Sequence, residues 1–101
     1  MGVSTHVLDV GSGRPAVGVP VRLEHDGRPI AEGVTDGDGR IGALAAGSVD
    51  PGMYRIVFDT AAQGNPFYPE VAITFVIEDG AEHYHIPLLL SGHGYTTYRG
   101  S

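Results

Sequence analysis

Three residues in this chain have side chains suited to acid–base hydrolysis. His6 lies in an alternating run near the start, and His85 lies in a second alternating run near the end. An imidazole titrates near neutral pH, so one histidine can take a proton from water while another polarises or protonates a leaving nitrogen. Arg40 offers a planar fork of donors for carbonyl oxygens and for the charge that develops during attack. The residue types leave open which histidine is the base.

Each of these residues also has a simpler interpretation. A single strand histidine is more often a hydrogen-bonded structural residue, and Arg40, which follows a glycine-rich turn, is commonly solvated. Because strand side chains alternate with period two, His83 lies on the same face as His85. It is therefore either a supporting residue of the site or a polar residue at the end of the strand. With His6 this pair would also supply three zinc ligands, a metal site that is physically allowed. His93 stands between two glycines in a turn, and we expect it to be exposed and non-catalytic.

Composition limits the classes of partner and compartment. The 101 residues form one domain over 1–101, with a net charge of −6. Acidic chains of this kind are poor ligands for nucleic acid or anionic membranes, so we expect neither as a partner. The chain has no cysteine and no apolar run of membrane-spanning length, and its start is too polar for a signal peptide. These features predict a cytoplasmic protein.

The elements that must position these residues are short strands. Alternating runs separated by glycine, proline and aspartate predict strands over 3–10, 17–24, 29–35, 40–44, 53–59, 71–78, 83–90 and 95–100. Pro20 indicates that the second of these is an edge strand, and residues 60–64 allow at most one helical turn. The run 36–39, rich in aspartate and glycine, is expected to be a plain turn rather than a calcium loop. Strands with turns about every 8 to 12 residues predict an all-β fold, an antiparallel β-sandwich.

Several segments of the chain match one known family in order. They are STHVLD (4–9), TDGDGR (35–40), FYPEV (67–71), HYHIPLLLS (83–91) and YRGS (98–101). Each is weak alone, but together they resemble the transthyretin-related 5-hydroxyisourate hydrolases. The resemblance implies a transthyretin-like (prealbumin-like) sandwich of two four-stranded sheets. It also implies a homotetramer whose dimers meet face to face around a central channel.

The resemblance also assigns functional residues. It implies a catalytic set of His6, Arg40, His85 and Ser101, with Tyr98 and Arg40 binding substrate in the same cavity. The implied reaction opens the ring of 5-hydroxyisourate at an amide bond, giving 2-oxo-4-hydroxy-4-carboxy-5-ureidoimidazoline without cofactor or metal. Because the last residues read as a strand, we expect the Ser101 carboxylate at a fixed place, where it could orient a histidine or hold the water.

Two departures from the family and two competing functions accompany the resemblance. The connection 61–66 is shorter than the family's helix-bearing one, and Gly92-His93 stands where relatives tend to have Pro-Tyr. A transthyretin-like carrier would bind a small hydrophobic ligand in the channel without chemistry. Carriers, however, have Lys in place of His6, an acidic residue in place of Arg40, and no YRGS ending. A generic adhesion sandwich would leave the histidines unexplained. The apolar stretch 87–90 is expected to need a second subunit to cover it.

Overall fold

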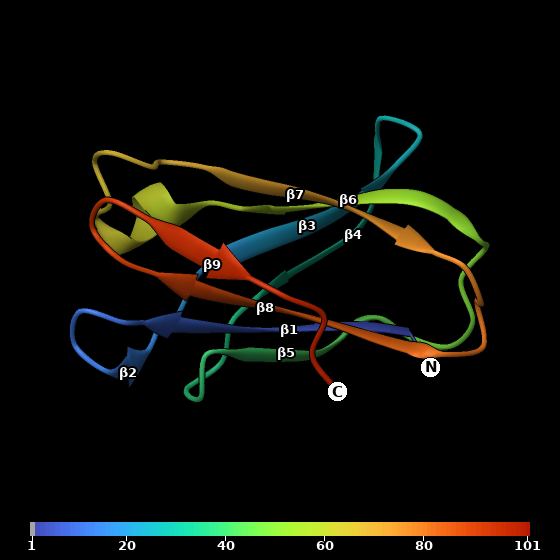
Figure 1. Ribbon diagram of the computed structural model, residues 1–101, viewed down its shortest axis with the longest axis horizontal. Coiled ribbons are helices and arrows are strands. Elements are labelled where there is room, and N and C mark those ends of the chain that lie inside the picture. Colours follow the sequence, from blue (N-terminus) through green and yellow to red (C-terminus); the bar gives the residue numbers. More distant parts are fainter. Residues whose placement is uncertain (1) are drawn as a thin grey trace.

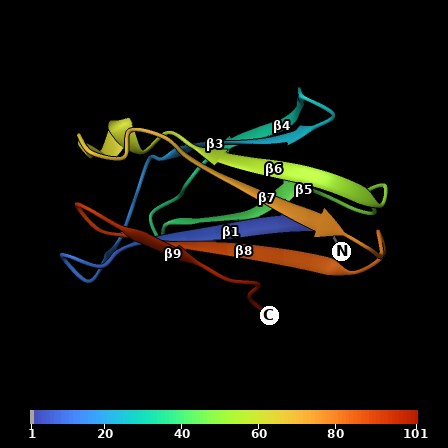
Figure 2. The same ribbon diagram turned by 45° about the horizontal axis from the view of Figure 1, so that its top comes forward.

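The computed structural model describes residues 2–101, which form two β-sheets packed face to face (Figures 1 and 2). The elements, in chain order, are β1 (Gly2–Asp9), β2 (Arg14–Pro15), β3 (Pro20–His25), β4 (Arg28–Val34), β5 (Arg40–Ala45), β6 (Gly52–Phe58), the 3₁₀ turn η1 (Thr60–Gln63), β7 (Val71–Ile77), β8 (His83–Leu90) and β9 (Tyr95–Thr97). The predicted all-β class is confirmed, and η1 shows that the short 61–66 connection keeps one helical turn.

The sheets have the strand orders β4-β3-β6-β7 and β2-β1-β8-β9, with β5 also paired to β1. The two-residue β2 is the fifth strand of the second sheet. Every pair is antiparallel as predicted except β1 and β8, which run parallel from Gly2↔His83 to Asp9↔Leu90. No hairpin sets their relative direction, because the chain passes through the opposite sheet between them.

The core lies between the two sheets and is filled by one alternating set of side chains. The predicted inward set of β6 is confirmed, with Tyr54 2%, Ile56 0% and Phe58 0% exposed. Val3 and Val7 of β1 are fully buried opposite them. Because alternate residues of a strand face opposite ways, Thr5 points inward with these two valines, at 1% exposed, while Ser4 and His6 must point out of the sandwich. The outer face of β1 is therefore available for a site.

Two predictions about individual strands are wrong. Pro20 does not mark an edge, because β3 lies between β4 and β6; the proline is tolerated as the first residue of the strand. The apolar stretch 87–90 does not need a second subunit. Three of its residues are buried within this chain and only Leu89 is half-buried.

Candidate active site

Strand register brings the predicted histidines and arginine to one outward face. His6 of β1 lies opposite Arg40 of β5, and Ser4 lies opposite His85 of β8. The neighbours of His85 in β8, Tyr84 and Ile86, are buried in the core, so His85 faces outward with His6. Three separate strands thus contribute to one surface of the β1–β8 sheet. His93 lies in a turn and is exposed, as predicted.

Ser4 is a member of this cluster that the sequence interpretation missed. Its Oγ lies 2.7 Å from Nε2 of His83 and 2.7 Å from Nδ1 of His85. The residue is only 6% exposed. Its position two residues before His6 places it on the same face, so the period-two parity applied to His6 would have found it.

Arg40 is positioned by the turn that precedes β5. The backbone N–H groups of Asp38 and Arg40 donate to Oδ1 of Asp36, at 2.9 and 3.0 Å. These hydrogen bonds, that from Arg40 first, lower the pKa of the Asp36 carboxyl, and the charges of Arg40 and His6 act in the same direction. The plain turn predicted here is confirmed, and its acidic residue holds the backbone from which the guanidinium extends.

Gly39 locks that turn against β1. Its φ is +73°, and its carbonyl accepts from the N–H of Val7 at 2.7 Å. A Cβ at this position would lie 2.5 Å from the carbonyl oxygen of Val7. Glycine is therefore required both for the left-handed backbone and for the close approach. This contact holds the start of β5 against Val7, the residue that follows His6 in β1.

The end of the chain packs against His85. After β9 ends at Thr97, the N–H of Gly100 donates to the carbonyl of His85 at 2.8 Å. A Cβ on Gly100 would lie 2.5 Å from Cδ2 of His85. Both overall views place the chain end on the side of this sheet that faces away from the other sheet (Figures 1 and 2). The imidazole is thus held between Ser4 and the backbone of Gly100.

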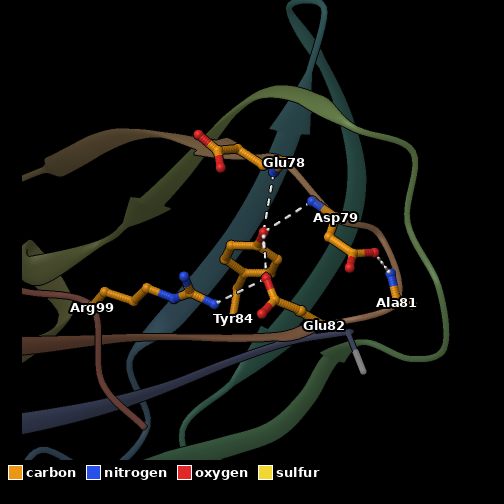
Figure 3. Close-up of polar contacts among 6 residues, drawn as sticks. All are labelled: Glu78, Asp79, Ala81, Glu82, Tyr84 and Arg99. Carbon is orange, nitrogen blue, oxygen red and sulfur yellow. Dashed lines mark hydrogen bonds and ion pairs between the residues drawn. The ribbon is translucent and has the colours of Figure 1, made fainter.

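Arg99 anchors this terminal segment, a role that the sequence did not reveal. Its guanidinium lies 4.3 Å from the centroid of the Tyr84 ring and 3.7 Å from Oε2 of Glu82 (Figure 3). The Tyr84 hydroxyl accepts hydrogen bonds from the N–H groups of Glu78 and Asp79. The cation–π contact therefore ties the chain end to the turn between β7 and β8.

The predicted final strand over 95–100 is wrong beyond Thr97. Pro87 lies where the ladder would continue and has no N–H to donate, so regular pairing stops there. Thr97 Oγ1 donates to the Pro87 carbonyl at 2.8 Å, and pairing resumes only at the isolated bridge between Gly100 and His85. The expected strand is replaced by a short irregular segment.

The two other predicted site residues lie in or after this segment. Tyr98 is 57% exposed and borders a cavity of about 390 Å³, whose walls include Phe75, Tyr84 and Ile86. Ser101 is exposed, and within residues 2–101 no hydrogen bond joins it to His85 or its partners. The assigned functions of Tyr98 and Ser101 therefore stay predictions.

The environment of His85 suits a neutral proton acceptor. Its pKa lies below the ordinary value of 6.5, first because of burial and then because of the charges of Arg40, His6 and His83. At neutral pH the ring is therefore uncharged. Within residues 2–101 no group of three or more His, Cys, Asp or Glu side chains is arranged to hold a metal ion. Over the same residues no helix is long and apolar enough to cross a membrane.

The two-sheet sandwich, with histidines and an arginine on the outer face of its β1–β8 sheet, defines a transthyretin-fold protein with an acid–base cluster. More specifically, the chain belongs to the HIUase/Transthyretin family, whose family model matches residues 3–100. It is 44% identical over 109 residues to the 5-hydroxyisourate hydrolase of Salmonella typhimurium, covering 98% of this chain and 80% of that protein.

Solved structures of both kinds of family member resemble this chain. The structure of Klebsiella pneumoniae 5-hydroxyisourate hydrolase aligns with a TM-score of 0.89 at 36% identity, and each chain is covered completely, at 100%. Sea bream transthyretin in complex with thyroxine aligns with a TM-score of 0.87 at 35% identity, covering 99% of this chain and 95% of that one. The backbone is thus about equally close to a hydrolase and to a thyroxine-bound protein. Fold similarity alone does not choose between them.

Proposed function

We propose that this chain is an enzyme of urate degradation that hydrolyses 5-hydroxyisourate to 2-oxo-4-hydroxy-4-carboxy-5-ureidoimidazoline. The observation that carries the proposal is the convergence of His6, Arg40 and His85 on one outward sheet face. The hydrolase named above, 44% identical over nearly the whole chain, supports the same reaction.

The cluster can supply the groups that amide hydrolysis needs. A neutral His85, acting with His6, takes a proton from water while the oxygen bonds to the ring carbonyl carbon. Arg40 donates to the carbonyl oxygen as it gains negative charge. The C–N bond then breaks, and the ring nitrogen takes the proton back from the histidine pair. Ser101 would orient a histidine or hold the water, and Tyr98 would bind the substrate. No metal or cofactor is needed for this sequence of steps.

A ligand carrier is the alternative function, because thyroxine-bound sea bream transthyretin aligns with this chain at a TM-score of 0.87. Against it stands the chemistry of the outward face. A channel that only binds a hydrophobic ligand has no need for a half-buried histidine of lowered pKa flanked by an arginine. Perturbed titratable groups of this kind are typical of catalytic sites.

We also propose that the protein is a cytoplasmic homotetramer whose substrate site is completed by the facing subunit. The strands β7 and β9 are both sheet edges, and the cavity of about 390 Å³, which Tyr98 lines but His6, Arg40 and His85 do not, lies between them. Val76 and Tyr98 at this edge are 54% and 57% exposed. Unpaired edges with exposed apolar side chains favour assembly. Sedimentation at working concentration tests this, and a monomer would contradict both the tetramer and the composite site.

The decisive experiment follows the ultraviolet decay of freshly generated 5-hydroxyisourate with and without the protein. Because the substrate also hydrolyses unaided, the quantity measured is the acceleration over that background. We expect strong acceleration that His85→Ala abolishes and that His93→Ala, a substitution of an exposed turn histidine, leaves intact. Unchanged decay with a folded wild-type tetramer would exclude the hydrolase and favour the carrier.

A further inference from the structure

The Ser4 hydroxyl joins the two outward histidines of β8. It lies 2.7 Å from Nε2 of His83 and 2.7 Å from Nδ1 of His85, and it separates an exposed ring from a half-buried one. We propose that His83, Ser4 and His85 form a proton relay, with Ser4 as the positioning residue that sets which nitrogen of His85 is protonated. The inference rests on the proposed function, which gives the relay a reaction to serve.

The single proton of the hydroxyl couples the two rings. A serine hydroxyl has one hydrogen to donate and lone pairs to accept with. With a ring nitrogen at 2.7 Å on each side, it donates to one imidazole and accepts from the other. If Ser4 donates to Nε2 of His83, then Nδ1 of His85 must carry a hydrogen. In that arrangement Nε2 of His85 keeps its lone pair and can act as a base.

The surroundings of the ring are compatible with this arrangement and keep His85 neutral. Within residues 2–101 the hydrogen bonds of the His85 ring are confined to Nδ1, so Nε2 is left for substrate or water. The positive charge of Arg40 acts on this ring and disfavours a doubly protonated imidazolium, so one ring nitrogen keeps its lone pair. Burial also lowers the pKa of His85, which makes a lasting imidazolium there unfavourable. His83 is exposed, so water can solvate a positive charge on it.

The relay moves one proton outward and then back. Nε2 of His85 takes a proton from water as the hydroxide oxygen bonds to the carbonyl carbon. Nδ1 of His85 passes its proton to Oγ of Ser4, which gives its own proton to Nε2 of His83. His83 then carries the charge and His85 is again neutral. When the C–N bond breaks, Nε2 of His85 protonates the leaving nitrogen, and His83 returns a proton through Ser4 to Nδ1.

A purely structural role for Ser4 explains less. The strands β1 and β8 are already joined by a continuous parallel ladder from Gly2↔His83 to Asp9↔Leu90. The side-chain hydrogen bonds add little to that pairing. They do, however, fix the orientation and the tautomer of a half-buried ring, which is what a general base requires.

Kinetics of four variants test the relay. General acid–base catalysis is typically worth 10²- to 10⁴-fold, so losing the relay while keeping the base should lower kcat by roughly 10- to 100-fold with little change in KM. We expect this fall for Ser4→Ala, whereas Ser4→Thr, which keeps the hydroxyl, should recover most of the activity. His83→Gln should fall as far, because an amide can hydrogen bond to Ser4 but cannot carry the proton. The pair Ser4→Ala with His83→Gln should fall no further than either alone.

Other outcomes would overturn the relay. His83→Gln with wild-type kcat would show that no proton reaches that ring, and equal losses in Ser4→Ala and Ser4→Thr would show that the hydroxyl is not what matters. His93→Gln, an exposed histidine outside the cluster, should be unchanged. If Ser4→Thr does not fold, the His83 variant and the following measurement still decide.

A second measurement is independent of activity. Nitrogen-15 spectra of labelled histidine report which ring nitrogen carries hydrogen. We expect His85 of the free protein to be protonated at Nδ1, and Ser4→Ala to abolish that preference. A His85 protonated at Nε2 in the wild type would refute the relay. If the wild type failed to accelerate 5-hydroxyisourate decay, the proposed function would fail, while these spectra would still report the Ser4–His85 coupling.

Discussion

Gly100→Ala is the substitution whose effect follows most directly from the packing around His85. The added Cβ would lie 2.5 Å from Cδ2 and 3.3 Å from Cγ of that ring. Carbon atoms in contact stand about 3.5–4.0 Å apart, so the ring or the chain end must move by roughly 1 Å. Ser4 holds the opposite side of the ring at 2.7 Å, so the movement breaks that hydrogen bond or the one from Gly100.

A misplacement of this size has a large effect on a positioned catalytic group. About 1 Å typically costs on the order of 10²-fold, so kcat/KM should fall by about 100-fold, or roughly 2.7 kcal/mol of transition-state stabilisation. Overpacking should lower the free energy of unfolding by only about 1 kcal/mol, the low end of the usual range, because the chain end is partly exposed. Initial rates of 5-hydroxyisourate decay and a thermal melt measure the two effects separately.

Gly92→Ala is the matched control for this substitution. Among the described residues a Cβ there would meet nothing within 4 Å, and Gly92 lies in the turn between β8 and β9, outside the segment that contacts His85. We expect it to keep wild-type rates and melting temperature. A folded Gly100→Ala variant whose kcat/KM stayed within about threefold of wild type would refute this prediction, since the methyl group would then be accommodated without disturbing His85.

Three further predictions concern the turn, the pH dependence and the core. Asp36→Ala removes the oxygen that accepts from the N–H of Arg40, so kcat/KM should fall roughly tenfold, while Asp36→Asn, which keeps an oxygen, should stay near wild type. The pKa of His85 lies below its ordinary 6.5, chiefly because of burial, so kcat/KM should hold down to that pH and fall only in more acid solution. The unfolded chain binds that proton more readily, so the stability from this group is also lost as the pH falls through the lowered pKa; a rate that halves already above pH 6.5 would contradict the assignment. Phe58→Ala should lower the free energy of unfolding by about 3–5 kcal/mol in urea titrations, since the ring is 0% exposed, and a loss below about 1 kcal/mol would show that the core collapses around the gap.

Local patterns in the sequence predicted the elements better than their arrangement. The alternation of apolar and polar residues predicted the bounds of β6 and β8 to within one residue, because this pattern depends only on residues adjacent in sequence. The parallel pairing of β1 with β8 was not visible, because it joins residues about eighty positions apart and no hairpin turn specifies it. The prediction that Pro20 marks an edge strand was wrong for a related reason. A proline is compatible with either an edge strand or the first residue of an inner one, and only the sheet order decides.

The residues of the candidate site were likewise only partly predictable from the sequence. His6, Arg40 and His85 were found from their chemistry together with the family resemblance, and the register places them on one face. Ser4 and Gly100 were missed because their roles depend on their contacts with His85, which is distant in sequence from Ser4 and lies in a different segment of the chain from both. The Oγ of Ser4 lies 2.7 Å from Nδ1 of His85, and Gly100 packs against Cδ2 of the same ring. The residue type of a serine or a glycine does not by itself indicate a role in a site, so these two roles can be recognised only once the position of the His85 ring is known.

The alternation that builds the sandwich also explains how one backbone resembles both a hydrolase and a thyroxine-bound transthyretin so closely, with TM-scores of 0.89 and 0.87. In β1 the inward residues Val3 and Val7 are 0% exposed and hold the two sheets together, while Ser4 and His6 between them face outward. Changing the outward set leaves the core contacts untouched, so the fold does not constrain the chemistry on its outer face. Function in this family must therefore be argued from every second residue of β1 and β8. In this chain those residues include Ser4, His6, His83 and His85, and Arg40 of β5 lies opposite His6.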